Sequence, residues 1–213
     1  MKPITIHGPA GNIEAIEESP RINAYPHLTA IVCHPHPQYQ GTMHNKVVTT
    51  VCRAFRHLGI HCIRFNYRGV ENSQGSYDHG NGEVDDLTAV IDNVKQANPD
   101  QQLLLAGFSF GGSVAYKGAS QRQDVAGLLT IAPAVVNFPL TEFAEPHVPW
   151  CVIQGHQDEV VSPKAVFDFV CCQTNATATI IKCQAGHFFH GKLNELKQAI
   201  IWHYQPRLAD GLG

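Results

Sequence analysis

Short stretches rich in aliphatic and β-branched residues alternate with stretches of helical periodicity along most of this 213-residue chain. Such alternation is typical of a mostly parallel sheet with helices on both faces, because parallel strands need long crossover connections. The eight predicted strands are Ile4–His7, Asn12–Glu17, Leu28–Cys33, His61–Asn66, Gln102–Ala106, Gly127–Ile131, Trp150–Gln154 and Thr177–Cys183. No helical segment separates the first two, so we expect an antiparallel start to the sheet.

Helical spacing of apolar residues marks the intervening segments. In the first of them Val47, Val51, Phe55 and Leu58 recur on one face, and Gly59 follows as a stop signal. The predicted helices are His44–Leu58, Glu83–Ala97, Gly111–Gln121, Pro163–Cys172 and Lys192–Tyr204. No repeat or linker interrupts the chain, so residues 1–213 are expected to form one domain, with a frayed tail from Pro206.

Composition excludes several functional classes. A formal charge of -3 and the lack of any basic run argue against a nucleic-acid partner. The apolar runs are far shorter than the roughly 20 residues of a membrane helix, and the first 18 residues lack the apolar core of a signal peptide. Seven cysteines, without a CxxC pair, predict reduced core residues and a cytoplasmic location.

The strongest chemical signal is Gly107-Phe108-Ser109-Phe110-Gly111, which follows an apolar strand and opens a helix rich in small residues. This G-x-S-x-G pattern places its serine on a sharp strand-to-helix turn, where side chains two positions either side would collide. Glycine at 107 and 111 avoids that collision. The Ser109 hydroxyl is therefore predicted to lie exposed at a helix N-terminus, where developing negative charge is favoured.

A serine nucleophile needs a histidine base and an acid, each expected after a later strand. Asp158 follows the strand that ends at Gln154, and His187 follows the strand that ends at Cys183. The order Ser109, Asp158, His187 is that of α/β-hydrolases. Glu159 is the weaker alternative for the acid, with a solvated position or a helix cap as its ordinary explanation. His190 is the weaker alternative for the base and a candidate for lining the pocket.

These motifs, with Cys33-His34-Pro35-His36-Pro37 and Asn66-Tyr67-Arg68-Gly69-Val70, resemble the α/β-hydrolases, close to small capless bacterial enzymes grouped near the dienelactone hydrolases. The resemblance implies a three-layer α/β-hydrolase fold with a mostly parallel eight-stranded sheet. Dienelactone hydrolases proper carry cysteine where this chain has Ser109, so their substrate does not follow. The connection from Ala132 to Pro149 is too short for a cap domain.

The oxyanion hole is expected to combine the backbone N–H of Phe110 with one from the loop after Cys33. Pro35 and Pro37 have no N–H to donate, which makes His36 the first choice, with Gln38 or Tyr39 behind it. No further ligands at metal-site spacing accompany His34 and His36, so we predict neither metal nor cofactor.

Four side chains are candidates for the substrate pocket: Tyr39, Arg68, Phe138 and His190. Arg68 fits either a substrate carboxylate or an anchor for its own loop, and the anchor is the favoured interpretation. Phe138, with Leu140 and Phe143, fits an apolar wall or packing over the sheet edge equally well.

The residues together predict a serine hydrolase that cleaves small or medium carboxylic esters, with a small-molecule substrate as its partner. A serine peptidase or amidase and a non-catalytic binding protein on the same scaffold are the alternatives. The oligomeric state does not follow from the sequence.

Overall fold

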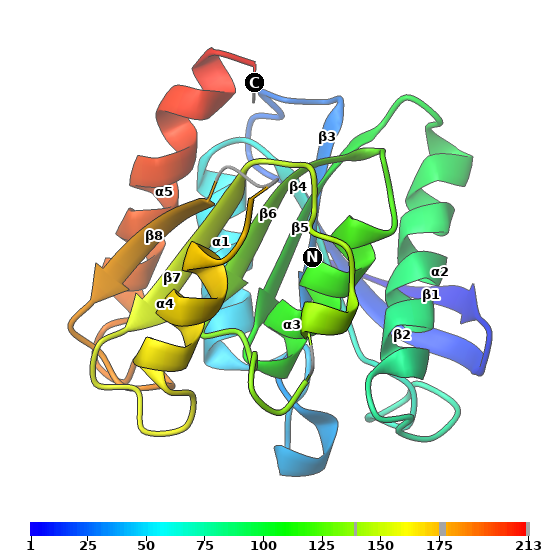
Figure 1. Cartoon of the computed structure of the whole chain (residues 1–213). Helices are drawn as coiled ribbons and strands as arrows, with labels where there is room; N and C mark the ends of the chain where they lie inside the picture. Colours follow the sequence, from blue (N-terminus) through cyan, green and yellow to red (C-terminus); the bar gives the residue numbers. More distant parts are fainter. Residues whose placement is uncertain (139, 175–177, 212–213) are drawn as a thin grey trace.

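The computed structural model describes residues 1–138, 140–174 and 178–211, and its centre is an eight-stranded sheet of order β1-β2-β4-β3-β5-β6-β7-β8 (Figure 1). β2 pairs antiparallel with both β1 and β4, and every later pairing is parallel. The strands are β1 Lys2–Gly8, β2 Gly11–Glu18, β3 Leu28–Cys33, β4 His61–Phe65, β5 Gln102–Phe108, β6 Val125–Ile131, β7 Trp150–Gly155 and β8 Ala178–Cys183. The predicted antiparallel start is confirmed, while Thr177 lies outside the described residues.

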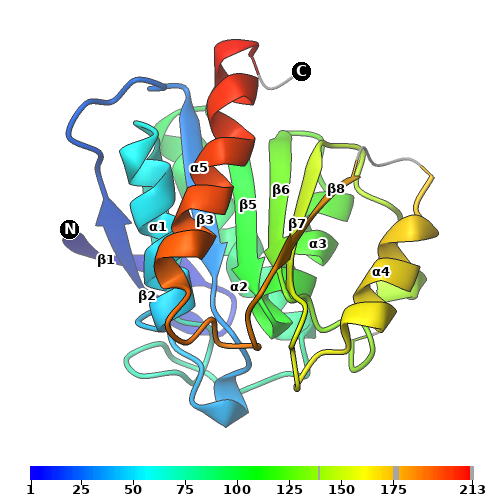
Figure 2. The same ribbon diagram turned by 90° about the vertical axis from the view of Figure 1, so that its left-hand side faces the viewer.

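Helices cover both faces of this sheet, as the sequence predicted (Figures 1 and 2). α1 and α5 share one apolar cluster with one face, and α2, α3 and α4 share a second cluster with the other. Their bounds are α1 Lys46–His57, α2 Asn81–Ala97, α3 Phe110–Ser120, α4 Pro163–Cys171 and α5 Leu193–Ala209, with short 3-10 helices η1 Pro37–Tyr39 and η2 Leu140–Glu142. Because helices cover both faces, a central strand such as β3 is buried at every residue.

The last helix corrects one prediction, since α5 continues through Pro206 to Ala209 instead of fraying there. Proline inside a helix removes one backbone hydrogen bond. Tyr204 and Leu208 are nonetheless buried in the cluster that α1 and α5 share, and the Tyr204 ring lies 5.3 Å from that of Phe55. Burial of these side chains outweighs the bond that proline removes.

Six parallel strands end at one edge of the sheet, and the loops that follow β3, β5, β7 and β8 carry the predicted chemistry. The connection between β6 and β7 carries only η2 among its described residues, which leaves this edge without a cap domain. Within the described part of the chain, no helix is both long and apolar enough to span a membrane.

Candidate active site

Ser109 occupies the sharp turn between β5 and α3, with the left-handed φ of 55° and ψ of -122°. A non-glycine residue in such a conformation stores roughly 1–3 kcal/mol of strain, which the surrounding structure must hold. A Cβ atom at Gly107 would overlap the carbonyl oxygen of Gly111, and one at Gly111 would overlap the carbonyls of Cys33 and His34. Both glycines are therefore required for the turn that presents the Ser109 hydroxyl.

A continuous chain of hydrogen bonds joins the three predicted triad residues. His187 Nε2 lies 3.1 Å from Ser109 Oγ, and His187 Nδ1 lies 2.9 Å from Asp158 Oδ2. Because Nδ1–H donates to the carboxylate, Nε2 is left as an acceptor facing the hydroxyl. The His187 side chain is 3% exposed, and its ring lies 4.9 Å from the Phe108 ring at a tilt of 37°, so its orientation is restricted by packing as well as by hydrogen bonds.

Asp158 is held as a carboxylate by four donors. Oδ1 accepts the backbone N–H groups of Val160 and Val161 at 2.9 and 2.7 Å, while Oδ2 accepts from His187 and from Gln154 Nε2 at 3.0 Å. Burial opposes ionisation, but the hydrogen bonds from His187 and the two backbone amides outweigh it and hold the pKa of Asp158 below its usual range.

The sequence did not predict two side chains that bond to Asp158 and His187, those of Gln154 and Glu159. Gln154 is a buried polar residue at the end of an otherwise apolar strand, which is the signal that could have identified it. Glu159 accepts the backbone N–H of His187 at 3.3 Å. The carboxylate considered as an alternative acid therefore contacts the backbone of the histidine loop, and the histidine ring faces Asp158.

The two expected oxyanion donors lie on adjoining segments. Phe110 is the first residue of α3, where backbone N–H groups lack partners within the helix, and its ring lies 4.9 Å from that of His36. Gln38 N–H donates to His36 Nδ1 and Tyr39 N–H donates to the His36 carbonyl, at 3.2 and 3.1 Å. Among the described residues, the N–H of His36 has no partner, so of these three amides it is the one left to donate.

The guanidinium of Arg68 forms an ion pair with the buried Asp86 carboxylate. Its Nε and Nη2 donate to both carboxylate oxygens of Asp86 at 2.8–3.1 Å, and its backbone N–H donates to the same carboxylate at 2.8 Å. Asp86 is 1% exposed at its side chain and Arg68 is 11% exposed. This geometry matches the loop-anchor interpretation of Arg68, because a bidentate pair leaves little of the guanidinium for a substrate.

The apolar candidates in the connection between β6 and β7 pack inward. Phe138 is buried against the Phe110 ring at 5.5 Å and over Gly80, and Leu140 is 1% exposed. The ring of Phe143 lies 4.3 Å beneath Lys117 Nζ. Phe138 and Leu140 thus contribute to the core beside α3, although Phe138 also backs the residue that follows the nucleophile.

An open groove of about 430 Å³ lies between the start of α1 and the loop after His187. Phe188 and Leu193 line it on the histidine side together with His190, which is exposed, and Val47 lines it from α1. Tyr39 extends into solvent, 82% exposed, with its ring 4.9 Å from His36. The Tyr39 ring thus contacts His36 and the His190 ring lies 5.7 Å from that of Phe188. Among the described residues, neither side chain is bonded to Ser109, Asp158 or His187.

Known proteins resemble this chain over nearly all of its length. Residues 40–145 match a family model described as serine aminopeptidase, S33. A curated, uncharacterised protein of Rickettsia prowazekii is 37% identical and covers 94% of this chain and 87% of its own length.

Two solved structures are similar at comparable identity. An alpha-beta serine hydrolase homologue from Coxiella burnetii is 42% identical, with a TM-score of 0.86 and coverage of 95% of this chain and 96% of that one. An α/β serine hydrolase without lid from Xanthomonas campestris is 40% identical, with a TM-score of 0.88 and coverage of 96% and 94%.

Proposed function

The chain belongs to the α/β-hydrolase superfamily, among its serine hydrolases, and on that basis we propose that it cleaves small or medium carboxylic esters through a Ser109-His187-Asp158 triad. The observation that carries the proposal is the unbroken path of hydrogen bonds from the buried Asp158 carboxylate through His187 to Ser109, whose backbone is strained by its positive φ.

In this mechanism His187 Nε2 takes the proton of Ser109 Oγ while the oxygen attacks the ester carbonyl carbon. The tetrahedral oxyanion accepts hydrogen bonds from the N–H groups of Phe110 and His36. His187 then donates its proton to the departing alcohol, leaving an acyl group on Ser109. Water, deprotonated by the same imidazole, attacks that acyl group and releases the carboxylic acid, which regenerates the hydroxyl.

The open groove beside the histidine loop supports a substrate of modest size. Its volume of about 430 Å³ accommodates a short acyl or alkyl chain against Phe188, Leu193 and Val47. Among the described residues, no cap domain covers the sheet edge that carries Ser109, Asp158 and His187, which favours an ester that enters from solvent and makes few enclosing contacts.

Labelling with a fluorophosphonate tests the proposal, because this probe modifies only an activated serine. Wild type should incorporate one probe per chain at Ser109, and Ser109→Ala should incorporate none while its unfolding curve stays similar. Ser113→Ala is a matched control, since Ser113 is a buried serine of α3, the helix that begins directly after Ser109. A wild-type protein that stays unlabelled would instead support a binding protein on this scaffold.

A peptidase or amidase is the second candidate, favoured by the description of the matching family model. Peptide and ester cleavage proceed through the same acyl-enzyme, so the triad does not separate them. Turnover of p-nitrophenyl acetate, butyrate and octanoate, set against aminoacyl p-nitroanilides, distinguishes the two by kcat/KM.

We also propose a reducing, cytoplasmic location from the cysteines. All seven lie in the described part of the chain and all are free. Cys33, Cys52, Cys62 and Cys151 are buried as predicted, whereas Cys171 and Cys172 are exposed and Cys183 is partly buried, so these three are not core residues. Burial raises the pKa of Cys33 and of Cys151 to about 12, so these thiols are poor nucleophiles at neutral pH.

A further inference from the structure

The loop that carries His36 leaves the sheet where the backbone pairing of β3 with β4 stops. That parallel pairing ends at Val32 opposite Arg64. Beyond this pair, β3 ends at Cys33 and is followed by His34, and β4 ends at Phe65 and is followed by Asn66 and Tyr67. Buried backbone groups need partners, and here side chains supply two of them: His34 accepts the N–H of Tyr67, and Ser73 donates to the carbonyl of Asn66. The dipeptide Asn66-Tyr67 contacts both arms of the loop that His36 belongs to.

The outgoing arm is fastened through His34. Its Nε2 accepts the backbone N–H of Tyr67 at 3.1 Å, while its Nδ1 donates to the carbonyl of Pro35 at 2.6 Å. Burial lowers the pKa of His34 to about 3, so the imidazole stays neutral and keeps one donor and one acceptor at neutral pH. His34, two positions before His36, is thus fixed to Tyr67 in the segment that follows β4.

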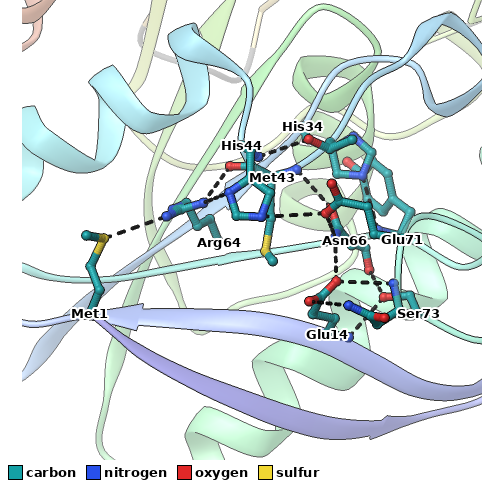
Figure 3. A network of polar contacts seen from close by, with 12 residues as sticks. Met1, Glu14, His34, Met43, His44, Arg64, Asn66, Glu71 and Ser73 are labelled. Atoms are coloured by element: carbon teal, nitrogen blue, oxygen red, sulfur yellow. Dashed lines mark hydrogen bonds and ion pairs between the residues drawn. The ribbon is translucent and has the colours of Figure 1, made fainter.

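The returning arm is fastened through Asn66, whose side chain lies at the centre of the polar network in Figure 3. Oδ1 accepts the backbone N–H of Met43 at 2.9 Å, and Nδ2 donates to Glu14 Oε2 at 2.8 Å and to Glu71 Oε2. Asn66 is fully buried, and its backbone N–H and carbonyl are bonded to Glu14 and Ser73. These bonds fix both the side-chain amide and the backbone of Asn66 in one orientation.

The segment between the two anchors is a tight turn around His36. The carbonyl of His36 accepts the N–H groups of both Tyr39 and Gly41 at 3.1 Å. A Cβ at Gly41 would overlap the carbonyl oxygen of Pro35, so the returning arm packs directly on the outgoing one. A displacement of Met43, two residues after Gly41, is therefore transmitted to His36.

We propose that Asn66 is a positioning residue for the oxyanion hole: it holds the returning arm of the loop so that the His36 N–H points at the developing oxyanion. The inference rests on the proposed function, because it concerns a donor that acts only when Ser109 attacks a carbonyl. Asn66 touches no reacting atom, and its effect passes through Met43 and Gly41.

The test compares Asn66→Leu with Asn72→Leu, using kcat per fluorophosphonate-labelled site so that misfolded molecules are not counted. Asn72 is a matched control, because its side chain also donates to Glu14, from an exposed position, without contacting the loop. Asn66→Leu should lower kcat by about 10- to 100-fold with KM changed less than threefold, below the roughly 10²–10³ that loss of a donor costs. Asn72→Leu should stay within threefold of wild type.

A second variant keeps the experiment interpretable if Asn66→Leu folds poorly. Asn66→Asp retains an oxygen for Met43 but places a third carboxylate beside Glu14 and Glu71. The neighbouring titratable group is His44, 3.6 Å from Glu71, and the neighbouring cation is Arg64, which contacts His44 and donates to the Met43 carbonyl. Protonation at mildly acidic pH restores a donor toward these glutamates. The ratio of its kcat to that of wild type should therefore rise from pH 8 to pH 6.

Three outcomes would overturn the inference: Asn66→Leu with wild-type kcat per labelled site, equal losses in Asn66→Leu and Asn72→Leu, or an Asn66→Asp ratio that does not change with pH. If wild type itself stays unlabelled, the proposed function fails instead, so the two failures are distinguishable.

Discussion

Replacing Asp158 by asparagine tests the triad most sharply, because the structure fixes which way the new amide must face. Oδ1 of Asp158 accepts two backbone N–H groups, from Val160 and Val161, so the amide oxygen has to remain on that side. The NH₂ group then points at His187 Nδ1. Gln154 can turn its amide to receive it, since Gln154 Oε1 has no partner within the described residues. The substitution therefore fits without steric change.

The consequence of Asp158→Asn is the opposite tautomer of the His187 imidazole. A donor opposite Nδ1 forces the proton onto Nε2, the nitrogen that must accept from Ser109. By the precedent of serine hydrolases with the same arrangement, kcat should fall by about 10⁴, or about 5.4 kcal/mol of transition-state stabilisation. The assay is turnover of p-nitrophenyl butyrate from pH 6 to 9, with labelled sites counted by fluorophosphonate.

Glu159→Gln is the matched control, because it neutralises the adjacent carboxylate while an amide oxygen can still accept the His187 N–H. It should change kcat less than fivefold. An Asp158→Asn enzyme within tenfold of wild type would refute the tautomer argument, and a larger loss in Glu159→Gln than in Asp158→Asn would reassign the acid.

Three further predictions concern stability, each measured by urea unfolding. Gly111→Ala should lose about 2–3 kcal/mol because its Cβ overlaps two carbonyl oxygens, whereas Gly112→Ala, with its nearest atoms at 3.3 Å, should lose less; equal losses would contradict the packing argument. Arg68→Met should lose about 3–5 kcal/mol by leaving the buried Asp86 carboxylate unpaired, and adding Asp86→Leu should recover most of it; an additive double variant would show that the pair is not coupled. Since burial lowers the pKa of His34 from 6.5 to about 3, its unfolded state takes up a proton first as pH falls. Wild type should therefore lose up to about 1.4 kcal/mol per pH unit between pH 6.5 and 3 relative to His34→Asn, and parallel pH curves for the two would contradict this.

Periodicity predicted the sheet and helices well because burial on both faces leaves a strong local pattern. β3 and β5, for example, begin at the predicted residues, Leu28 and Gln102. The end of α5 was not predictable in the same way. Proline at 206 is a local stop signal, and the compensating contact of Tyr204 with Phe55 joins residues about 150 positions apart. A sequence pattern contains a local signal such as this proline but not a contact between residues so far apart.

The supporting polar residues illustrate the same limit. The sequence predicts Asn66 as the last residue of a strand, whereas in the structure β4 ends one residue earlier, at Phe65. The partners of Asn66, Glu14, Met43 and Glu71, come from three other segments, and none of them stands at a spacing that marks a shared site. Only the folded arrangement identifies the residue as buried and fully bonded.

The proximity of Ser109, Asp158 and His187 was predictable because strand register converts distance along the chain into proximity. Phe108 pairs with Ile131, Ile131 with Ile153, and the last residue of β7, Gly155, with Cys183. The strands that precede Ser109, Asp158 and His187 therefore end almost level across the sheet. Each residue lies within four positions of its strand end, which leaves little chain to carry it elsewhere. A motif at one strand end thus constrains what must follow the others. The partners of Asn66 come from β2 and from two loops and form no motif, so the sequence places no comparable constraint on Asn66.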